Sequence, residues 1–125
     1  DLDVTSPLRN VKDIKTALNQ FTKEKSDTLI SVCKSRKNPY FNMIEIINNK
    51  VKVIKEKRSR NKITRRQNAP VVYEMNASIY IWKRSALINN KPLFSKRTSV
   101  YLMPFERSID IDNELDFKLV EFLMK

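Results

Sequence analysis

The fold of this chain is decided by a short apolar run at residues 28–33, Thr28-Leu29-Ile30-Ser31-Val32-Cys33. Its length and its β-branched residues predict a buried strand, as found in parallel sheets. Directly upstream, Val11, Ile14, Leu18 and Phe21 recur at the spacing of one helical face. A helix that leads into a buried strand is the repeating element of α/β folds.

The residues before this helix extend the pattern to a strand–helix–strand unit. Residues 2–5 read as the end of a strand that Pro7 breaks, and Asn10 with Asp13 three residues later predicts the helix cap. Such a unit favours parallel strands, so we expect an α/β fold. A strand at residue 2 lacks a preceding partner, so we also expect upstream sequence to begin the sheet.

The remaining segments alternate between apolar runs and polar turns. The sequence predicts a hairpin that turns at Asn48-Asn49-Lys50, a polar loop at 56–67 and a closing helix at 113–125. Further strands are expected at residues 71–73, 78–82 and 99–103, and a short helix at 83–89.

Composition restricts the chemistry of the chain. Its 125 residues, 41% apolar and 31% charged, fit one globular domain. It has no histidine and one cysteine, which excludes a His/Cys zinc site, a Ser-His-Asp triad and an internal disulfide within this sequence. It also has no glycine, so this sequence contains no glycine-rich phosphate loop, and if the protein handles a nucleotide that loop lies elsewhere. Its twelve asparagines can partly replace glycine in left-handed turns.

The sequence carries no membrane or secretion signal. No apolar run approaches the ~18 to 20 residues that cross a bilayer, and the first residues lack the basic and apolar regions of a signal peptide. We therefore expect a cytoplasmic protein without a membrane partner.

The formal charge of +11 is concentrated in a basic stripe from Lys50 to Arg66, where nine lysines and arginines accompany a lone Glu56. Such a stripe suits phosphate ligands or nucleic acid, and an alternative function is a basic nucleic-acid-binding module. No aromatic residue lies within the stripe and no nucleic-acid-binding motif is present, so we expect no nucleic-acid partner.

A pair of carboxylates lies in the segment Ser108-Ile109-Asp110-Ile111-Asp112. In extended backbone, residues two apart point the same way, so Asp110 and Asp112 would project together while the two isoleucines face the core. Two converging carboxylates suit Mg²⁺, which adds water and substrate phosphates to one or two carboxylate ligands. The alternative is that Asp112 or Asn113 caps the final helix and that Asp110 is a surface residue.

Two other segments could bind ligands. Arg65-Arg66-Gln67-Asn68-Ala69-Pro70, followed by Asn76 and Tyr80, offers a planar guanidinium for a carboxylate or phosphate and hydrogen bonds for hydroxyl groups. The alternative there is a solvated basic loop. Residues 3–9 end a strand before a helix, a position where ligands gather in open α/β sheets, although simple turn chemistry also explains them.

Taken together and in this order, the three segments resemble the acylneuraminate cytidylyltransferases, which include the CMP-sialic acid and CMP-legionaminic acid synthetases. The resemblance covers the whole chain, and the Ser-Ile-Asp-Ile-Asp block is its most specific part. The matching motifs are Thr5-Ser6-Pro7-Leu8-Arg9, Arg66-Gln67 with Pro70, Asn76 through Tyr80-Ile81, and Ser108-Ile109-Asp110-Ile111-Asp112 with Glu114-Leu115-Asp116.

This resemblance implies a nucleotide-diphospho-sugar-transferase-like, Rossmann-like three-layer sandwich with an inserted lobe that pairs two subunits of a homodimer. Residues 1–36 and 95–125 would be the carboxyl-terminal part of the catalytic domain and 37–94 the lobe, with the amino-terminal CTP-binding half absent. The implied reaction transfers CMP from CTP to a nonulosonic acid and releases pyrophosphate, for bacterial surface glycan or glycoprotein synthesis. This chain by itself would be inactive.

The resemblance also implies roles for individual residues. Asp110 and Asp112 would be catalytic and hold Mg²⁺, and Arg66 would bind the sugar-acid carboxylate from the partner subunit. The complete set of expected substrate-binding residues is Asp3, Ser6, Arg9, Arg66, Asn76 and Tyr80.

The chain departs from the family pattern at three places. The family usually has Gln-Pro where this chain has Asp3-Val4, and an ionised carboxylate cannot donate a hydrogen bond, which slightly favours a legionaminic-type acid over N-acetylneuraminate. The family's Asn-Gly is here Asn76-Ala77, and Phe41 stands where many members have a lysine.

Overall fold

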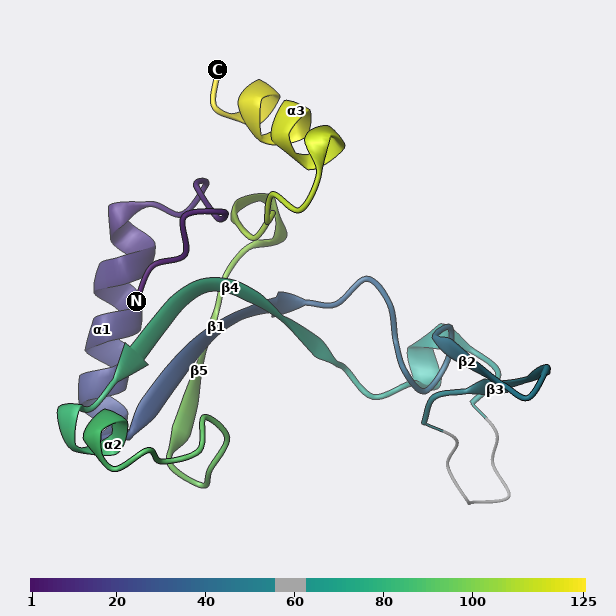
Figure 1. Cartoon of the computed structure of the whole chain (residues 1–125), viewed down its shortest axis with the longest axis horizontal. Helices are drawn as coiled ribbons and strands as arrows, with labels where there is room; N and C mark the ends of the chain where they lie inside the picture. Colours follow the sequence, from purple (N-terminus) through teal and green to yellow (C-terminus); the bar gives the residue numbers. More distant parts are fainter. Residues whose placement is uncertain (56–62) are drawn as a thin grey trace. The chain divides into compact units, whose positions relative to one another are not determined.

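The computed structural model describes residues 1–55 and 63–125, which divide into two compact units (Figure 1). The first unit comprises Asp1–Cys33 and Glu74–Lys125, and the second comprises Lys34–Tyr73. Residues 74–94 of the predicted lobe at 37–94 lie in the first unit, and the bounds of that lobe stay a prediction.

Helix α1 (Val11–Glu24) begins as the sequence predicts. The Asn10 side chain accepts a hydrogen bond from the Asp13 N–H, and the Asp13 carboxylate accepts one from the Asn10 N–H, each at 3.0 Å. This reciprocal capping box satisfies two backbone donors that the first helical turn leaves unpaired. The C-cap residue that follows the helix is Lys25, whose φ of 52° is left-handed.

The first unit is built on a three-stranded sheet with the order β4-β1-β5. Strand β1 (Thr28–Lys34) pairs in parallel with β5 (Thr98–Leu102), and Figure 1 shows that β4 (Tyr73–Trp82) runs opposite to β1. The predicted α/β class is confirmed. The parallel arrangement is confirmed for β1 and β5 but is wrong for β4, which makes the sheet mixed.

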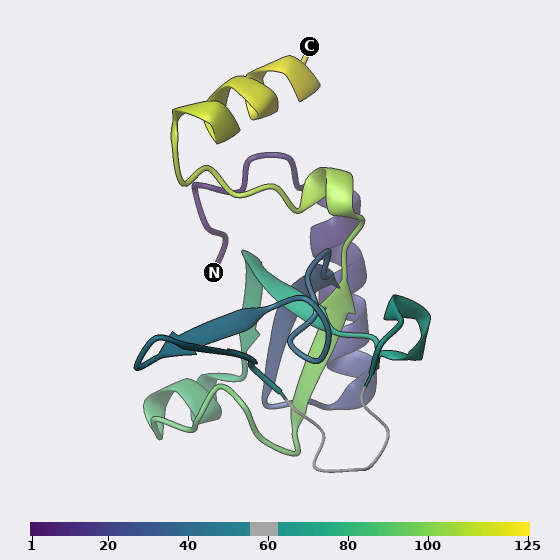
Figure 2. The ribbon, with the colours of Figure 1, turned by 90° about the vertical axis from the view of Figure 1, so that its right-hand side faces the viewer.

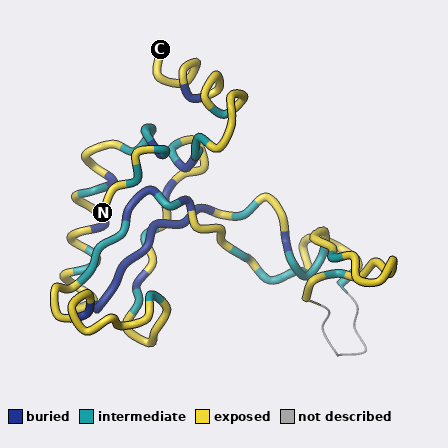
Figure 3. The backbone as a smooth tube through the Cα atoms, viewed as in Figure 1, coloured by how far each residue is buried: buried dark blue, intermediate teal, exposed yellow. Residues whose placement is uncertain are grey.

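The core of this unit lies where α1 covers the sheet. Ala17, Leu29, Ile79 and Met103 form its buried centre. Figure 3 shows that burial follows β1, whose first six residues are all buried. The run at residues 28–33 is therefore a buried strand, as predicted, and β1 is the middle strand of the sheet.

Strand β4 is continuous where the sequence predicted two shorter strands. Its irregularity lies at Asn76-Ala77, because Ala77 has a φ of 53° inside the strand. A left-handed residue with a Cβ is strained, so the strand accommodates one local distortion instead of ending.

The predicted strand at residues 2–5 is reduced to a single antiparallel bridge between Leu2 and Ile79. The chain then turns at Val4 and Thr5. The strand expectation was wrong beyond this bridge, because the turn removes residues 4 and 5 from pairing with β4.

The second unit contains a two-stranded antiparallel hairpin of β2 (Ile44–Ile47) and β3 (Lys50–Val53). Asn48 and Asn49 connect the strands with φ values of 50° and 60°, which fit the left-handed turn that tight hairpins need. The predicted hairpin and the predicted use of asparagine in place of glycine are both confirmed. A short 3-10 turn, η1 (Arg66–Asn68), follows later in this unit.

The rest of the first unit consists of α2 (Arg84–Ile88), a 3-10 turn η2 (Phe105–Arg107) and α3 (Glu114–Leu123). Figures 1 and 2 both show α3 apart from the sheet, and its Leu115, Phe117 and Phe122 side chains are exposed. Within residues 1–55 and 63–125, no helix combines the length and apolar character that crossing a bilayer requires.

We expect Ala77→Gly to raise the free energy of unfolding by about 0.5–1 kcal/mol, because glycine adopts a positive φ without the Cβ clash. Ala17→Gly is the matched control. The same substitution in the interior of α1 should lower stability by about 1 kcal/mol or more. Urea unfolding of both variants checks the pair, and a destabilised Ala77→Gly chain would show that the left-handed backbone at residue 77 carries no strain.

Candidate active site

A buried asparagine joins segments that are far apart in the sequence. Asn76 is 5% exposed, and its side-chain Nδ2 donates to Ser108 Oγ at 2.9 Å. Its Oδ1 accepts from Ser31 Oγ at 2.7 Å, and its backbone oxygen accepts from Ser6 Oγ at 3.0 Å. The structure thus brings together three predicted site segments, represented by Ser6, Asn76 and Ser108.

These contacts define what Asn76 does in the fold. Its amide is engaged with internal partners, because Ser78 N–H also donates to Oδ1 and Met103 Sδ accepts from Nδ2. Asn76 therefore holds the loops in place, and its predicted contact with a ligand stays a prediction. The role of Ser31 was missed from the sequence, although a serine inside a buried apolar strand was the available signal.

The carboxylate segment follows β5 and η2 in irregular backbone, not in a strand. Ile111 N–H donates to Thr5 O at 2.9 Å, which attaches the segment to the predicted loop at residues 3–9. Ile109 and Ile111 are half-buried, so the expectation that both face the core was too strong.

The two carboxylates have different environments. Asp110 is half-buried, and its Oδ1 is buried without a hydrogen-bond partner among residues 1–55 and 63–125. Asp112 is exposed, and its N–H donates to Asp116 Oδ2 at 3.2 Å. The cap of α3 is Asn113, whose Oδ1 accepts from two backbone N–H groups, so Asp112 is not used as the cap.

The Asp110 environment fits a hard cation. A buried carboxylate oxygen without a partner is costly, and a bound cation would satisfy it. Across the described parts of the chain, no group of three or more histidine, cysteine, aspartate or glutamate side chains gathers as a metal site. Asp110 and Asp112 could hold Mg²⁺ if water and phosphate oxygens supplied the other ligands, which is the usual coordination of this ion.

A second buried carboxylate fixes the start of this segment. Asp13 has a side chain 1% exposed, and Arg107 donates to it twice, from Nε to Oδ2 at 2.8 Å and from Nη2 to Oδ1 at 2.9 Å. Tyr101 donates from its hydroxyl to Oδ1 at 3.0 Å. We call Asp13, Tyr101 and Arg107 the Asp13 clamp.

The clamp shifts the ionisation of its members. The hydrogen bond from Arg107 lowers the pKa of Asp13, and the same bond raises the pKa of Arg107. Burial is the first cause that raises the pKa of Tyr101, followed by its hydrogen bond to Asp13. Asp13 is therefore ionised and Arg107 charged at neutral pH, as a bidentate ion pair requires.

The loop at residues 3–9 is stabilised by its own predicted site residues. Thr5 donates to Asp3 Oδ1 from its N–H at 3.1 Å and from its hydroxyl at 2.9 Å, and these bonds lower the pKa of Asp3. Arg9 donates to the backbone oxygens of Asp3 and Ser6. Tyr80 is half-buried on β4, and its backbone exchanges hydrogen bonds with Asp1.

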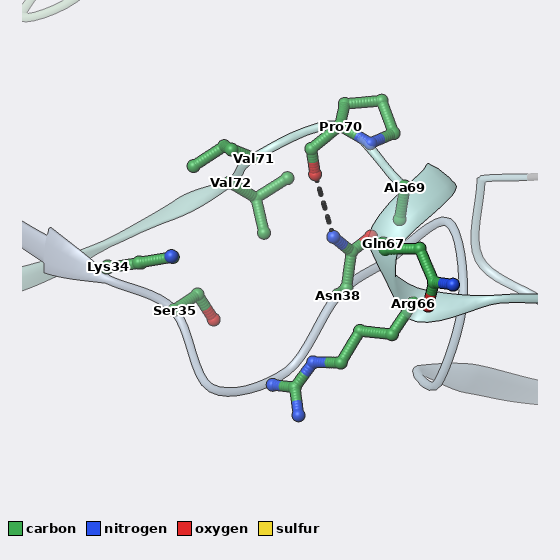
Figure 4. Close-up of a pocket in the computed structure, with 9 residues that line it drawn as sticks. All are labelled: Lys34, Ser35, Asn38, Arg66, Gln67, Ala69, Pro70, Val71 and Val72. Atoms are coloured by element: carbon green, nitrogen blue, oxygen red, sulfur yellow. Dashed lines mark hydrogen bonds between the residues drawn. The ribbon is translucent and has the colours of Figure 1, made fainter.

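The second unit has a hollow of about 420 Å³ beside Arg66, shown in Figure 4. Asn38 Nδ2 donates to Pro70 O at 2.8 Å, and Arg66 Nη2 donates to Arg36 O at 2.7 Å, so two bonds fix its walls. Figure 4 shows Lys34 and Arg66 reaching toward the same space. The lining contains these two cations and no carboxylate: Lys34, Ser35, Asn38, Arg66, Gln67, Ala69, Pro70, Val71 and Val72. An anion would be favoured there.

The basic stripe is partly outside the described residues, because residues 56–62 are not among them. Of the part that the structure describes, Lys52 pairs with Glu45 at 3.1 Å. Lys55 lies with its Nζ 5.5 Å from the centre of the Tyr40 ring. These two lysines are engaged with neighbouring side chains.

Cys33 does not have the features of a nucleophile. It is buried, and its Sγ donates to Glu74 Oε1 at 3.4 Å. Burial, followed by this hydrogen bond, raises the pKa of the Cys33 thiol to about 11, so the reactive thiolate is scarce at neutral pH.

The geometry defines an α/β protein with a carboxylate pair beyond β5 and a cationic hollow in its second unit. Known proteins are similar to this chain along all or nearly all of its length. The chain is 46% identical over 125 residues to post-translational flagellin modification protein B of Campylobacter coli, covering all of this chain and 52% of that protein. It is 48% identical over 124 residues to CMP-N,N'-diacetyllegionaminic acid synthase of Campylobacter jejuni, covering 99% of this chain and 51% of that protein.

A more distant similarity extends to an N-acylneuraminate cytidylyltransferase of Streptococcus agalactiae, 31% identical over 116 residues, covering 93% of this chain and 27% of that protein. No family model matches the chain. These relatives confirm the resemblance to the acylneuraminate cytidylyltransferases, and the chain spans about half the length of the two Campylobacter proteins. None of the three is named as a nucleic-acid-binding protein, so they give the alternative function no support.

We expect acid to destabilise the first unit through Asp13. Its pKa is lowered by folding, so its stabilising contribution is fully present above the unfolded value of ~3.9 and is lost as pH falls through the lower folded value. Urea unfolding between about pH 5 and pH 2 should show this loss. The slope should be smaller in Asp13→Asn, and an unchanged slope would show that Asp13 does not contribute.

Proposed function

We propose that this chain is the metal-binding and sugar-binding part of a cytidylyltransferase. The whole protein would transfer CMP from CTP to a nonulosonic acid of legionaminic type and release pyrophosphate, for bacterial surface glycan or glycoprotein synthesis. The observation that carries this proposal is the 48% identity, along almost the entire chain, to a protein named as a CMP-N,N'-diacetyllegionaminic acid synthase.

Asp110 and Asp112 are the proposed Mg²⁺ ligands. When bound, Mg²⁺ would neutralise the charge of the CTP phosphates. The support from this chain is the buried, unpaired Oδ1 of Asp110 and the exposed carboxylate two residues later. Ser6, Asn76 and Ser108 would keep this segment beside the loop at residues 3–9, where Asp3 and Arg9 hold the turn.

The hollow of the second unit is the proposed site for the carboxylate of the sugar acid. Arg66 has one terminal nitrogen bonded to Arg36 O, which fixes the guanidinium while its remaining donors can meet a ligand. Lys34 adds positive charge to the same hollow. In the proposed homodimer, this Arg66 would serve the active site of the partner subunit, with Tyr80 lining the sugar pocket.

The proposed fold of the whole protein is a nucleotide-diphospho-sugar-transferase-like sandwich, in which other sequence supplies the CTP-binding half. The hairpin would contribute to dimerisation, because Ile44, Ile46 and Val51 are exposed and an isolated hairpin is marginally stable in water. The chain by itself would be inactive, and the cytoplasmic location stays a prediction.

Asp110→Asn and Asp112→Asn should each lower kcat/KM by about 100-fold or more in the full-length protein, because a catalytic metal supplies several kcal/mol of charge stabilisation. The measurement is pyrophosphate release from CTP with N,N'-diacetyllegionaminic acid or N-acetylneuraminic acid as acceptor. Glu114→Gln is the control, an exposed carboxylate that pairs with Lys118 at 2.7 Å. Full activity in both aspartate variants would contradict the metal assignment, and no activity with either acid would contradict the proposed reaction.

Arg66→Lys should raise the KM for the sugar acid about ten-fold and leave the KM for CTP nearly unchanged, because lysine cannot make the bidentate contact to a carboxylate. Arg84→Lys on the surface of α2 is the matched control and should change neither constant. Equal increases in both KM values for Arg66→Lys would place Arg66 outside the sugar-acid site.

A further inference from the structure

The Asp13 clamp connects the first turn of α1 to the backbone that carries the carboxylate pair. Asp13 belongs to the capping box of α1, while Arg107 is the last residue of η2. Arg107 precedes Asp110 by three residues. The side chain of Arg107 is partly exposed, yet two of its nitrogens are directed at a carboxylate that is almost completely buried.

Three separate contacts hold the segment between Arg107 and Ile111. The first is the Arg107–Asp13 ion pair at 2.8 Å, and the second is the hydrogen bond of 2.9 Å from Asn76 to Ser108 Oγ. The third is the backbone hydrogen bond of 2.9 Å from Ile111 to Thr5. They lie on both sides of Asp110, so the backbone at this residue is fixed while its Oδ1 has no hydrogen-bond partner in the described part of the chain.

We propose that Asp13 is a positioning residue for the metal site, acting through Arg107 on the segment that carries Asp110 and Asp112. The inference rests on the proposed metal role of those two residues. A fork of two hydrogen bonds fixes both the distance and the orientation of the guanidinium, which a single contact does not. Tyr101 holds the carboxylate itself, so the position of Arg107 is defined relative to β5 as well as to α1.

The chain offers a matched control in Asp27, which directly precedes β1. Asp27 also has a nearly buried side chain, and it pairs with Lys91 at 2.9 Å and with Arg97 at 3.2 Å. Its partners do not lie in the carboxylate segment. Asp27→Asn therefore removes a comparable ion pair from the same unit, and it separates general destabilisation from loss of positioning.

The test uses two readouts on the full-length protein in the presence of CTP: amide hydrogen exchange at Ile111, and Mn²⁺ affinity from paramagnetic broadening of the NMR signals of residues 109–113. In Asp13→Asn, we expect Ile111 exchange to be about ten-fold faster because the segment opens locally. Mn²⁺ affinity should fall about ten-fold, in the range found when a residue supporting metal ligands is removed. Asp27→Asn should leave both quantities within about two-fold of the parent chain.

Two milder substitutions keep the test decisive if Asp13→Asn does not fold. Arg107→Lys retains the charge but loses the fork, so both readouts should change by less than in Asp13→Asn. Tyr101→Phe removes one hydrogen bond and keeps the ion pair, so it should have the smallest effect.

The outcomes separate this inference from the proposed function. Unchanged exchange and Mn²⁺ affinity in Asp13→Asn or Arg107→Lys would overturn the positioning role, and so would equal changes in Asp27→Asn. If the full-length parent protein with CTP binds no Mn²⁺ near residues 109–113, the metal assignment fails. The exchange rate of Ile111 then still decides whether the clamp fixes the segment.

Discussion

The buried amide of Asn76 is the interaction on which the first unit depends. Both ends of this amide are used: Oδ1 accepts from Ser31 on the central strand, and Nδ2 donates to Ser108 beyond β5. Leaving such a buried group unpaired costs about 1–3 kcal/mol, so the hydrogen bond from Asn76 to Ser108 holds the loop after β5 in place. The left-handed backbone at Ala77 follows directly in β4, at a cost that the surrounding bonds offset.

The same few contacts that close the fold determine where the carboxylates lie. Arg107 is held by Asp13, Ser108 by Asn76 and Ile111 by Thr5. A buried carboxylate oxygen without a partner is unfavourable unless a ligand compensates for it, and Asp110 Oδ1 is such an atom in the described chain. The same short segment therefore contributes to the stability of the unit and carries the carboxylates of the proposed chemistry. The cationic hollow beside Arg66 belongs to the second unit and has its own supporting bonds.

Local signals in the sequence predicted local structure well. The cap of α1 joins residues that are three apart, the apolar composition of β1 predicts its burial, and the Asn48-Asn49 turn follows from its own backbone preferences. The direction of β4 depends on its pairing with β1, which lies far away in the sequence. Such pairing leaves no periodic pattern in the sequence. Three of the predicted site residues or their motif neighbours, Ser6, Asn76 and Ser108, are joined by hydrogen bonds in the first unit. Ser31 and the Asp13 clamp were not predicted, because Asp13 and Arg107 lie 94 residues apart. The roles of the individual site residues stay predictions, since they concern ligands.

The most direct measurement of the central claim is a crystal structure of the full-length protein with CTP and Mn²⁺ in place of Mg²⁺, in which anomalous scattering locates the metal. The account predicts a Mn²⁺ peak about 2.1–2.2 Å from Asp110 Oδ1, with Asp112 on the same ion directly or through water and CTP phosphate oxygens completing the coordination. A metal that is bound to CTP but has neither Asp110 nor Asp112 among its ligands or their hydrogen-bond partners would contradict it.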